Sequence, residues 1–162
     1  MDNASQAARI LDNFDFKGVS SCTIRFFLNP DNERPDVAEL VFPSESENNF
    51  LSWSINEWDK YLEEQMTSRN IPKNGTIEAI QMDFCLEDSP KNGSYHIEAR
   101  PFLRGPLEFN RLVFERYDKL LTSDERVVLR TARDVADYCN NTPQTERWNR
   151  TKIMNDLPEV AH

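Results

Sequence analysis

The chain is poor in the residues on which most catalytic sites depend. Its 162 residues include only two His, three Cys and four Gly. The two histidines, His96 and His162, are too few for most general-base, triad and histidine–metal mechanisms. The sequence also lacks the HExxH, GxSxG, GxGxxG and P-loop motifs. We therefore expect no metal and no cofactor, and we favour a protein without catalysis of its own over an enzyme.

Long apolar runs and closely spaced cysteines are also missing. No stretch reaches the roughly 18 apolar residues that a membrane span needs, so we expect no membrane partner. Cys22, Cys85 and Cys139 lie far apart and form no CxxC pair, which is typical of free thiols in a reducing compartment. The chain begins with polar and acidic residues, unlike a signal peptide. These features predict a soluble, cytoplasmic protein.

Negative charge is abundant, and it is unevenly placed. Residues 1–100 carry 18 Asp and Glu against 9 Lys and Arg, whereas residues 101–162 carry 10 of each kind. The whole formal charge of −9 therefore falls in the first hundred residues. Acidity argues against general nucleic-acid binding, which needs a basic footprint. It favours solubility or a basic partner.

Hydrophobic periodicity predicts one α+β domain over residues 1–162. Apolar and polar residues alternate in four segments, which indicates strands with one buried side. The second pair is joined by a loop with Asn-Gly at its centre, a strong hairpin signal. Because the strands come as hairpins and not as βαβ units, we expect an antiparallel sheet of two β-hairpins. The predicted strands are 22–28, 37–42, 76–87 and 95–103.

Apolar spacing of three and four residues predicts helices on either side of the second hairpin. A short helix covers 5–13, and a long central helix covers 45–68, opened by a capping box between Ser44 and Glu47. From Gly105 the periodicity becomes helical, so we expect a helical C-terminal part, with a subdomain at 105–162 as one way to divide the domain. Its helices are predicted to begin near Pro106, Thr122 and Thr142.

Two charged surfaces are the candidate binding sites. The first is the outer side of the long helix, away from its apolar positions, and it carries Glu57, Asp59, Glu63 and Glu64. The second is a basic side of the C-terminal helices, suited to phosphate or to an acidic protein patch because Arg binds both in bidentate fashion. The alternative is a solvated face with ion pairs four residues apart. This second set is Arg126, Arg130, Arg133, Arg147, Trp148 and Arg150.

The predicted second hairpin holds the one candidate for catalysis. A loop centred near Lys91 and Asn92 pairs Glu87 with His96 and makes Cys85 a diagonal neighbour of His96. A thiol beside an imidazole is the elementary cysteine nucleophile. The alternative is a sheet face with cross-strand ion pairs, which we favour because nothing in the sequence supplies an oxyanion hole.

Together these patterns favour a small acidic intracellular interaction protein. Its charge is like that of inhibitor and immunity proteins, and it would dock on a basic partner surface through the acidic helix face. The first alternative is a nucleic-acid-binding module that uses the C-terminal Arg helices, and the second is a thiol enzyme that uses Cys85 and His96. A second copy of the chain is a further candidate partner for the Arg surface.

Overall fold

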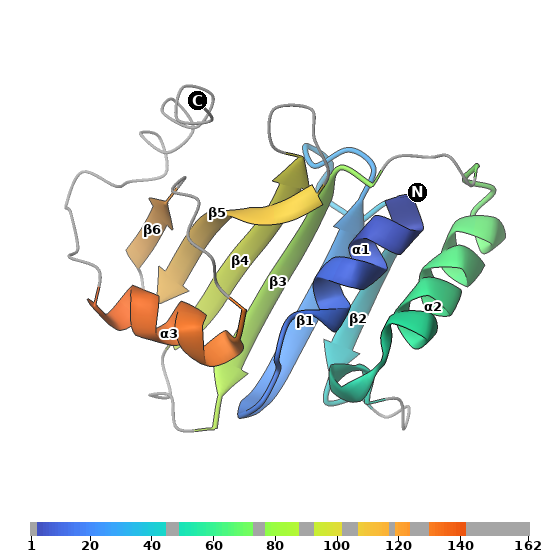
Figure 1. Ribbon diagram of the computed structural model, residues 1–162. Coiled ribbons are helices and arrows are strands. Elements are labelled where there is room, and N and C mark those ends of the chain that lie inside the picture. Colours follow the sequence, from blue (N-terminus) through green and yellow to red (C-terminus); the bar gives the residue numbers. More distant parts are fainter. Residues whose placement is uncertain are drawn as a thin grey trace.

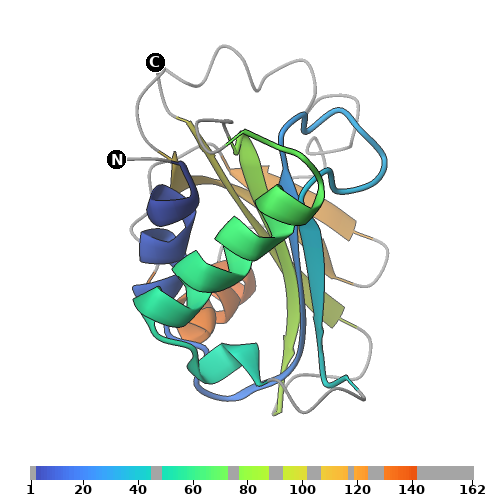
Figure 2. The ribbon, with the colours of Figure 1, turned by 90° about the vertical axis from the view of Figure 1, so that its right-hand side faces the viewer.

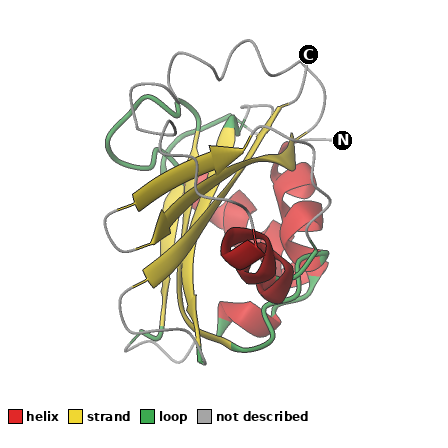
Figure 3. Cartoon of the chain, turned by 90° about the vertical axis from the view of Figure 1, so that its left-hand side faces the viewer, coloured by secondary structure: helices red, strands yellow, loops and turns green. Residues whose placement is uncertain are grey.

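Three helices lie on one face of an antiparallel sheet (Figure 1). Figures 2 and 3, which view the molecule from opposite sides, both place the helices on the same face, and no described helix covers the other. The computed structural model describes residues 3–44, 49–72, 77–87, 93–101, 107–116, 119–123 and 130–141. The elements are α1 (Asn3–Asp12), β1 (Val19–Phe27), β2 (Ala38–Phe42), η1 (Phe50–Ser52), α2 (Ile55–Ser68), β3 (Ala79–Leu86), β4 (Gly93–Pro101), β5 (Leu107–Arg116), β6 (Lys119–Ser123) and α3 (Ala132–Asn141).

The centre of the sheet consists of the two expected hairpins. β1 pairs with β2, and β3 pairs with β4, both antiparallel. The hairpins join through an antiparallel β1–β3 pairing, so the order is β2-β1-β3-β4, and β5 and β6 extend it at the β4 edge. The α+β class and the antiparallel sheet predicted from the sequence are therefore confirmed.

The core lies between the helices and the sheet. Alternate residues of each central strand are buried beneath the helices, as period-two patterning requires. Trp58 of α2 is fully buried, and its ring centroid lies 6.4 Å from that of Phe26 on β1 and 5.9 Å from that of Phe50. α2 is therefore anchored on the sheet by aromatic packing. Other fully buried large side chains are Leu11, Ile24, Leu62, Ile77, Ile80, Met82, Phe84 and Ile97.

The long central helix is shorter than the sequence predicts. Residues 49–54 form no α-helix, and α2 begins only at Ile55, so the prediction of a continuous helix is wrong there; residues 45–48, which include Glu47, lie outside the described residues. A second capping box, Ser54 with Glu57, starts α2 instead: Glu57 Oε1 accepts from the Ser54 backbone N–H at 3.1 Å. The break places Trp53 outside the helix, with its ring centroid 4.9 Å from that of Trp58.

The predicted C-terminal end of this helix is confirmed at Ser68. Asn70 has a φ of 57°, the left-handed conformation that commonly ends a helix. The backbone N–H of Ile71 donates to the Met66 carbonyl at 2.9 Å, and that of Asn70 donates to the Thr67 carbonyl at 3.1 Å. These two bonds form a Schellman motif, which satisfies carbonyls that the helix leaves without partners.

The C-terminal part differs most from the prediction. The helix expected from Pro106 is wrong over Leu107–Arg116 and Lys119–Ser123, which form β5 and β6. β-Propensity explains little of this, because Leu107–Arg116 holds only Phe109, Val113 and Phe114 of the favoured types. Pairing with the β4 edge supplies backbone hydrogen-bond partners that outweigh a helical apolar spacing. Thr122 lies in β6 and does not cap a helix. The helix predicted from Thr142 lies outside the described residues.

α3 begins ten residues later than the predicted start at Thr122, at Ala132. Its N-terminus is fixed by Thr131, whose Oγ1 accepts from the Asp134 backbone N–H at 2.9 Å. Ala132 and Val135 of α3 are fully buried. None of the helices in the described ranges has the length and hydropathy needed to cross a membrane.

Candidate functional site

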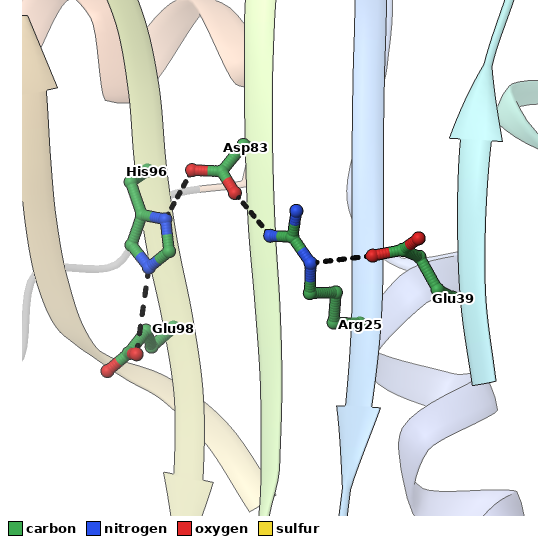
Figure 4. Close-up of polar contacts among 5 residues, drawn as sticks. All are labelled: Arg25, Glu39, Asp83, His96 and Glu98. Atoms are coloured by element: carbon green, nitrogen blue, oxygen red, sulfur yellow. Dashed lines mark hydrogen bonds and ion pairs between the residues drawn. The ribbon is translucent and has the colours of Figure 1, made fainter. Parts of the chain in front are cut away.

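A chain of alternating charges crosses the sheet on the face opposite the helices (Figure 4). It starts at Glu39 on β2 and runs through Arg25 on β1 and Asp83 on β3 to His96 and Glu98 on β4. Successive side chains of a strand point to opposite faces of the sheet. The residues of this row all point to the outer face, while their neighbours along each strand point into the core. We call these residues, together with Arg100, the ion chain.

Arg25 is the link between the two hairpins. Its Nε donates to Glu39 Oε2 at 2.8 Å, and its Nη1 donates to Asp83 Oδ2 at 2.8 Å. These carboxylates raise the pKa of Arg25, although burial alone acts to lower it. The register places Glu39 directly opposite Arg25, whereas Asp83 lies diagonally across the β1–β3 pair. The guanidinium therefore ties three strands together.

His96 is held between two carboxylates. Its Nδ1 contacts Asp83 Oδ1, and its Nε2 lies 3.6 Å from Glu98 Oε1. Burial acts to lower the pKa of His96, but hydrogen bonds and charge from Asp83 and Glu98 outweigh it and raise this pKa to about 9. Burial likewise acts to raise the pKa of Asp83, and its bonds to His96 and Arg25 bring it below the usual value. At neutral pH, His96 is therefore an imidazolium and is poorly suited to act as a general base.

Glu98 is the buried member of the ion chain. Its side chain is 8% exposed, and its Oε2 lies 3.4 Å from Arg100 Nε. A carboxylate buried on a sheet is costly unless cations surround it, and His96 and Arg100 provide them. With His96 protonated, the three acids of the ion chain face three bases, so this part of the surface is close to neutral.

The register of the second hairpin differs from the predicted one by four residues. Asp83, and not Glu87, lies opposite His96. Because the shift is even, Cys85 and His96 stay on the same side of the sheet, and Asp83 shares that side. Cys85 stays diagonal to His96, but both ring nitrogens of His96 are directed to carboxylates. This geometry favours the ion-pair interpretation over a thiol–imidazole pair.

The two described thiols occupy different environments. Cys22 and Cys85 are both free of disulfide bonds. Burial raises the pKa of the Cys22 thiol, so Cys22 is an inert core residue. Cys85 is half-buried on the face of the ion chain. Across the described ranges, no group of three or more His, Cys, Asp and Glu side chains could hold a metal ion.

The four predicted acidic residues of α2 do not form one uniform surface. Glu63 and Glu64 are exposed in the middle of the helix. Glu57 is exposed but accepts from both the backbone N–H and the hydroxyl of Ser54. Asp59 is half-buried and accepts from Ser5 Oγ at 3.3 Å, so it lies on the side turned toward α1. We call the four together the acidic α2 face, and its most accessible part is Glu63 and Glu64.

The predicted basic surface is only partly described. Arg130 precedes α3, and its backbone carbonyl accepts from the Asp15 N–H at 2.8 Å, so it does not share a helix face with Arg133. Arg130 and Arg133 are both exposed. The Asp134 carboxylate accepts from the Arg130 backbone N–H at 3.3 Å. The remaining predicted members, Arg126, Arg147, Trp148 and Arg150, lie outside the described residues.

The alternation of the strand predicted at 22–28 places Arg25 on its outer face, but it does not connect Arg25 with a site. Its partners Glu39 and Asp83 lie 14 and 58 residues away in the chain. The available signal was the strand alternation, which gives the face but not the neighbouring strand. Comparison of the chain with protein-family models, with curated proteins and with solved structures finds no match.

Proposed function

We propose that this protein is an interaction protein, inhibitor- or immunity-like, that docks on a basic protein surface through the acidic α2 face. The observation that carries the proposal is the exposure of Glu63 and Glu64 on the outside of a firmly anchored helix. Such a surface attracts a cationic partner and orients it during encounter.

The choice of α2 over the sheet follows from the balance of acidic and basic residues on each surface. The ion chain neutralises itself, because its acids and bases alternate across four strands. On α2, the exposed side chains include Glu57, Glu63 and Glu64 against one basic residue, Lys60. An excess of negative charge therefore stays directed outward on the helix, where a basic partner can reach it.

The packing of α2 supports a preorganised surface. Trp58, Leu62 and Met66 bury one side of the helix, and the capping box and the Schellman motif fix its two ends. A helix held at both ends presents its outer carboxylates in fixed positions, so binding orders little of the chain. Glu57 has a local structural role in this arrangement, whereas Glu63 and Glu64 are the positions best placed to contact a partner.

The proposal is tested by capture from an extract of the source cells. Three versions of the full chain serve as bait: the wild type, the α2 variant Glu63→Lys/Glu64→Lys and the control variant Asp31→Lys/Glu33→Lys. The control makes the same change in charge at two exposed residues of the β1–β2 connection. We expect a basic protein bound by the wild type and the control and lost from the α2 variant. A partner that all three baits retain equally would contradict the proposal.

Chromatography on immobilised heparin or single-stranded nucleic acid tests the alternative function, in which the chain binds nucleic acid. Retention of the full chain on heparin or on single-stranded nucleic acid, weakening steeply with salt, would support binding through the C-terminal Arg residues. Arg130→Glu/Arg133→Glu would then reduce retention, whereas Glu63→Lys/Glu64→Lys would not. We expect no such retention, because the chain carries a formal charge of −9.

A further inference from the structure

We propose that the hollow between the end of α1 and the segment before α2 receives an arginine side chain of the basic partner. The hollow has a volume of about 270 Å³. The end of α1 and the following loop line one side with Asp12, Phe14 and Asp15, and Leu51 and Trp53 line the other. The inference rests on the proposed function, and it specifies which partner side chain is recognised and where.

The walls of the hollow are firmly held. Phe14 is almost fully buried and packs edge-on against Phe16, with ring centroids 5.1 Å apart. Trp53 is half-buried, and its centroid lies 5.3 Å from that of Tyr61 and 6.2 Å from that of Phe50. Aromatic contacts on several sides fix the indole, and Trp53 is one of the residues that line the hollow. A preformed aromatic wall of this kind suits the flat face of a guanidinium.

The charge of the lining favours a cation. Asp12 and Asp15 are both exposed, and the lining includes no basic residue. In the part of the chain that is described, no hydrogen bond or ion pair occupies the Asp12 carboxylate, whereas Asp15 Oδ1 accepts from the Lys17 backbone N–H at 2.9 Å. α1 ends at Asp12, so the negative end of the helix dipole adds to the same field.

Arginine satisfies both features of the lining at once. Its planar guanidinium can stack on an indole and still donate from its edge to a carboxylate, which the ammonium of lysine cannot do in the same way. Trp53 also directly precedes the Ser54 cap of α2, so this wall of the hollow lies at the N-terminal end of the helix that carries the acidic α2 face. A basic partner lying along α2 could therefore place one arginine beside Trp53.

The test uses a defined probe and the full chain. N-acetyl-arginine-N-methylamide is titrated into isotope-labelled protein, and amide and indole NMR shifts are recorded. The citrulline analogue, which has nearly the same shape but no charge, is titrated in parallel. We expect saturable shifts of the Trp53 indole and of the amides at 12–16 and 51–53 with the arginine probe, and none with citrulline.

Two variants test whether the Asp12 carboxylate binds the arginine probe. Asp12→Asn should weaken binding of the arginine probe by about fivefold, because a charge-assisted hydrogen bond becomes a neutral one. Asp31→Asn, an equal change in charge at an exposed loop position, should leave the affinity unchanged. Shifts spread over the whole chain, equal binding of citrulline, or equal affinity of the Asp12→Asn and Asp31→Asn variants would each overturn the inference.

The outcome is separable from that of the proposed function. The probe needs no partner protein, so the hollow is tested without reference to Glu63 and Glu64. If the α2 charge reversals leave partner capture intact while the probe binds as expected, the docking face is wrong and the arginine site stands. If capture depends on α2 but the probe fails, the arginine site is wrong and the docking face stands.

Discussion

Arg25 on β1 contacts Asp83 on β3, with 2.8 Å between Nη1 and Oδ2. This ion pair lies across the seam where the two hairpins meet. The same carboxylate contacts His96 on β4, so Asp83 connects the charges of both hairpins. We therefore expect the ion chain to contribute to stability in a pH-dependent way.

Stability should fall at alkaline pH because of His96. Its pKa is about 9 in the folded chain, above the ordinary value of 6.5, so its contribution is complete below pH 6.5 and is lost as the pH rises through 9. The contribution is at most about 3 kcal/mol. Urea unfolding from pH 6 to pH 10 measures it, and His96→Gln should remove this component. Equal alkaline loss in both proteins would refute the assignment.

Removing the Asp83 carboxylate should lower the stability at pH 7 and also shift the pH of the alkaline transition. Asp83→Asn leaves Arg25 and His96 without a shared anion, so we expect a loss of about 2 kcal/mol in the free energy of unfolding at pH 7. The alkaline transition should also move to lower pH, because the pKa of His96 loses its main support. Glu39→Gln is the matched control: Glu39 is 44% exposed, and its loss should cost at most about 1 kcal/mol and leave the transition in place.

Glu57 and Glu64 should differ although both are exposed acids on α2. Glu57→Ala removes the acceptor for the Ser54 backbone N–H and hydroxyl and should cost about 1 kcal/mol. Glu64→Ala should change the free energy of unfolding by less than about 0.5 kcal/mol. Chemical denaturation measures both. Equal effects would show that the capping box does not stabilise α2.

Cys85 should not behave as an activated nucleophile. In a Cys139→Ser background, we expect iodoacetamide to modify Cys85 no faster than free cysteine at pH 7, because Asp83 and Glu98 hold the His96 proton. Cys22 should react only after unfolding, since it is buried. Mass spectrometry of timed samples identifies each site. Rapid modification of Cys85 that His96→Gln abolishes would instead support the thiol-enzyme alternative.

The sequence predicted the parts of the fold that depend on local signals. Alternation located β1 and β3 and told which face of each enters the core, because side-chain direction in a strand depends only on parity. It failed where partners far apart in the chain decide the outcome. Leu107–Arg116 has apolar spacing compatible with a helix, yet pairing with β4 makes it a strand.

Local sequence signals predict only part of the candidate site. The outward face of Asp83, Cys85 and His96 was predictable, since a register error of four residues preserves parity. The pairing of Asp83 with His96 and the contact with Arg25 were not, because turn geometry and the β1–β3 neighbourhood set them. On α2, two capping boxes of equal spacing compete in sequence, and only the structure identifies Ser54 as the start.

The proposed function depends on the binding of a basic partner to the acidic α2 face. The most direct measurement is the dissociation constant of the captured partner for the wild-type chain, for Glu63→Lys/Glu64→Lys and for Asp31→Lys/Glu33→Lys at one salt concentration. We predict at least about tenfold weaker binding for the α2 variant, from loss of complementary charge, and nearly unchanged binding for the loop variant. Equal weakening of both variants would mean that net charge alone governs binding, and it would contradict a docking site on α2.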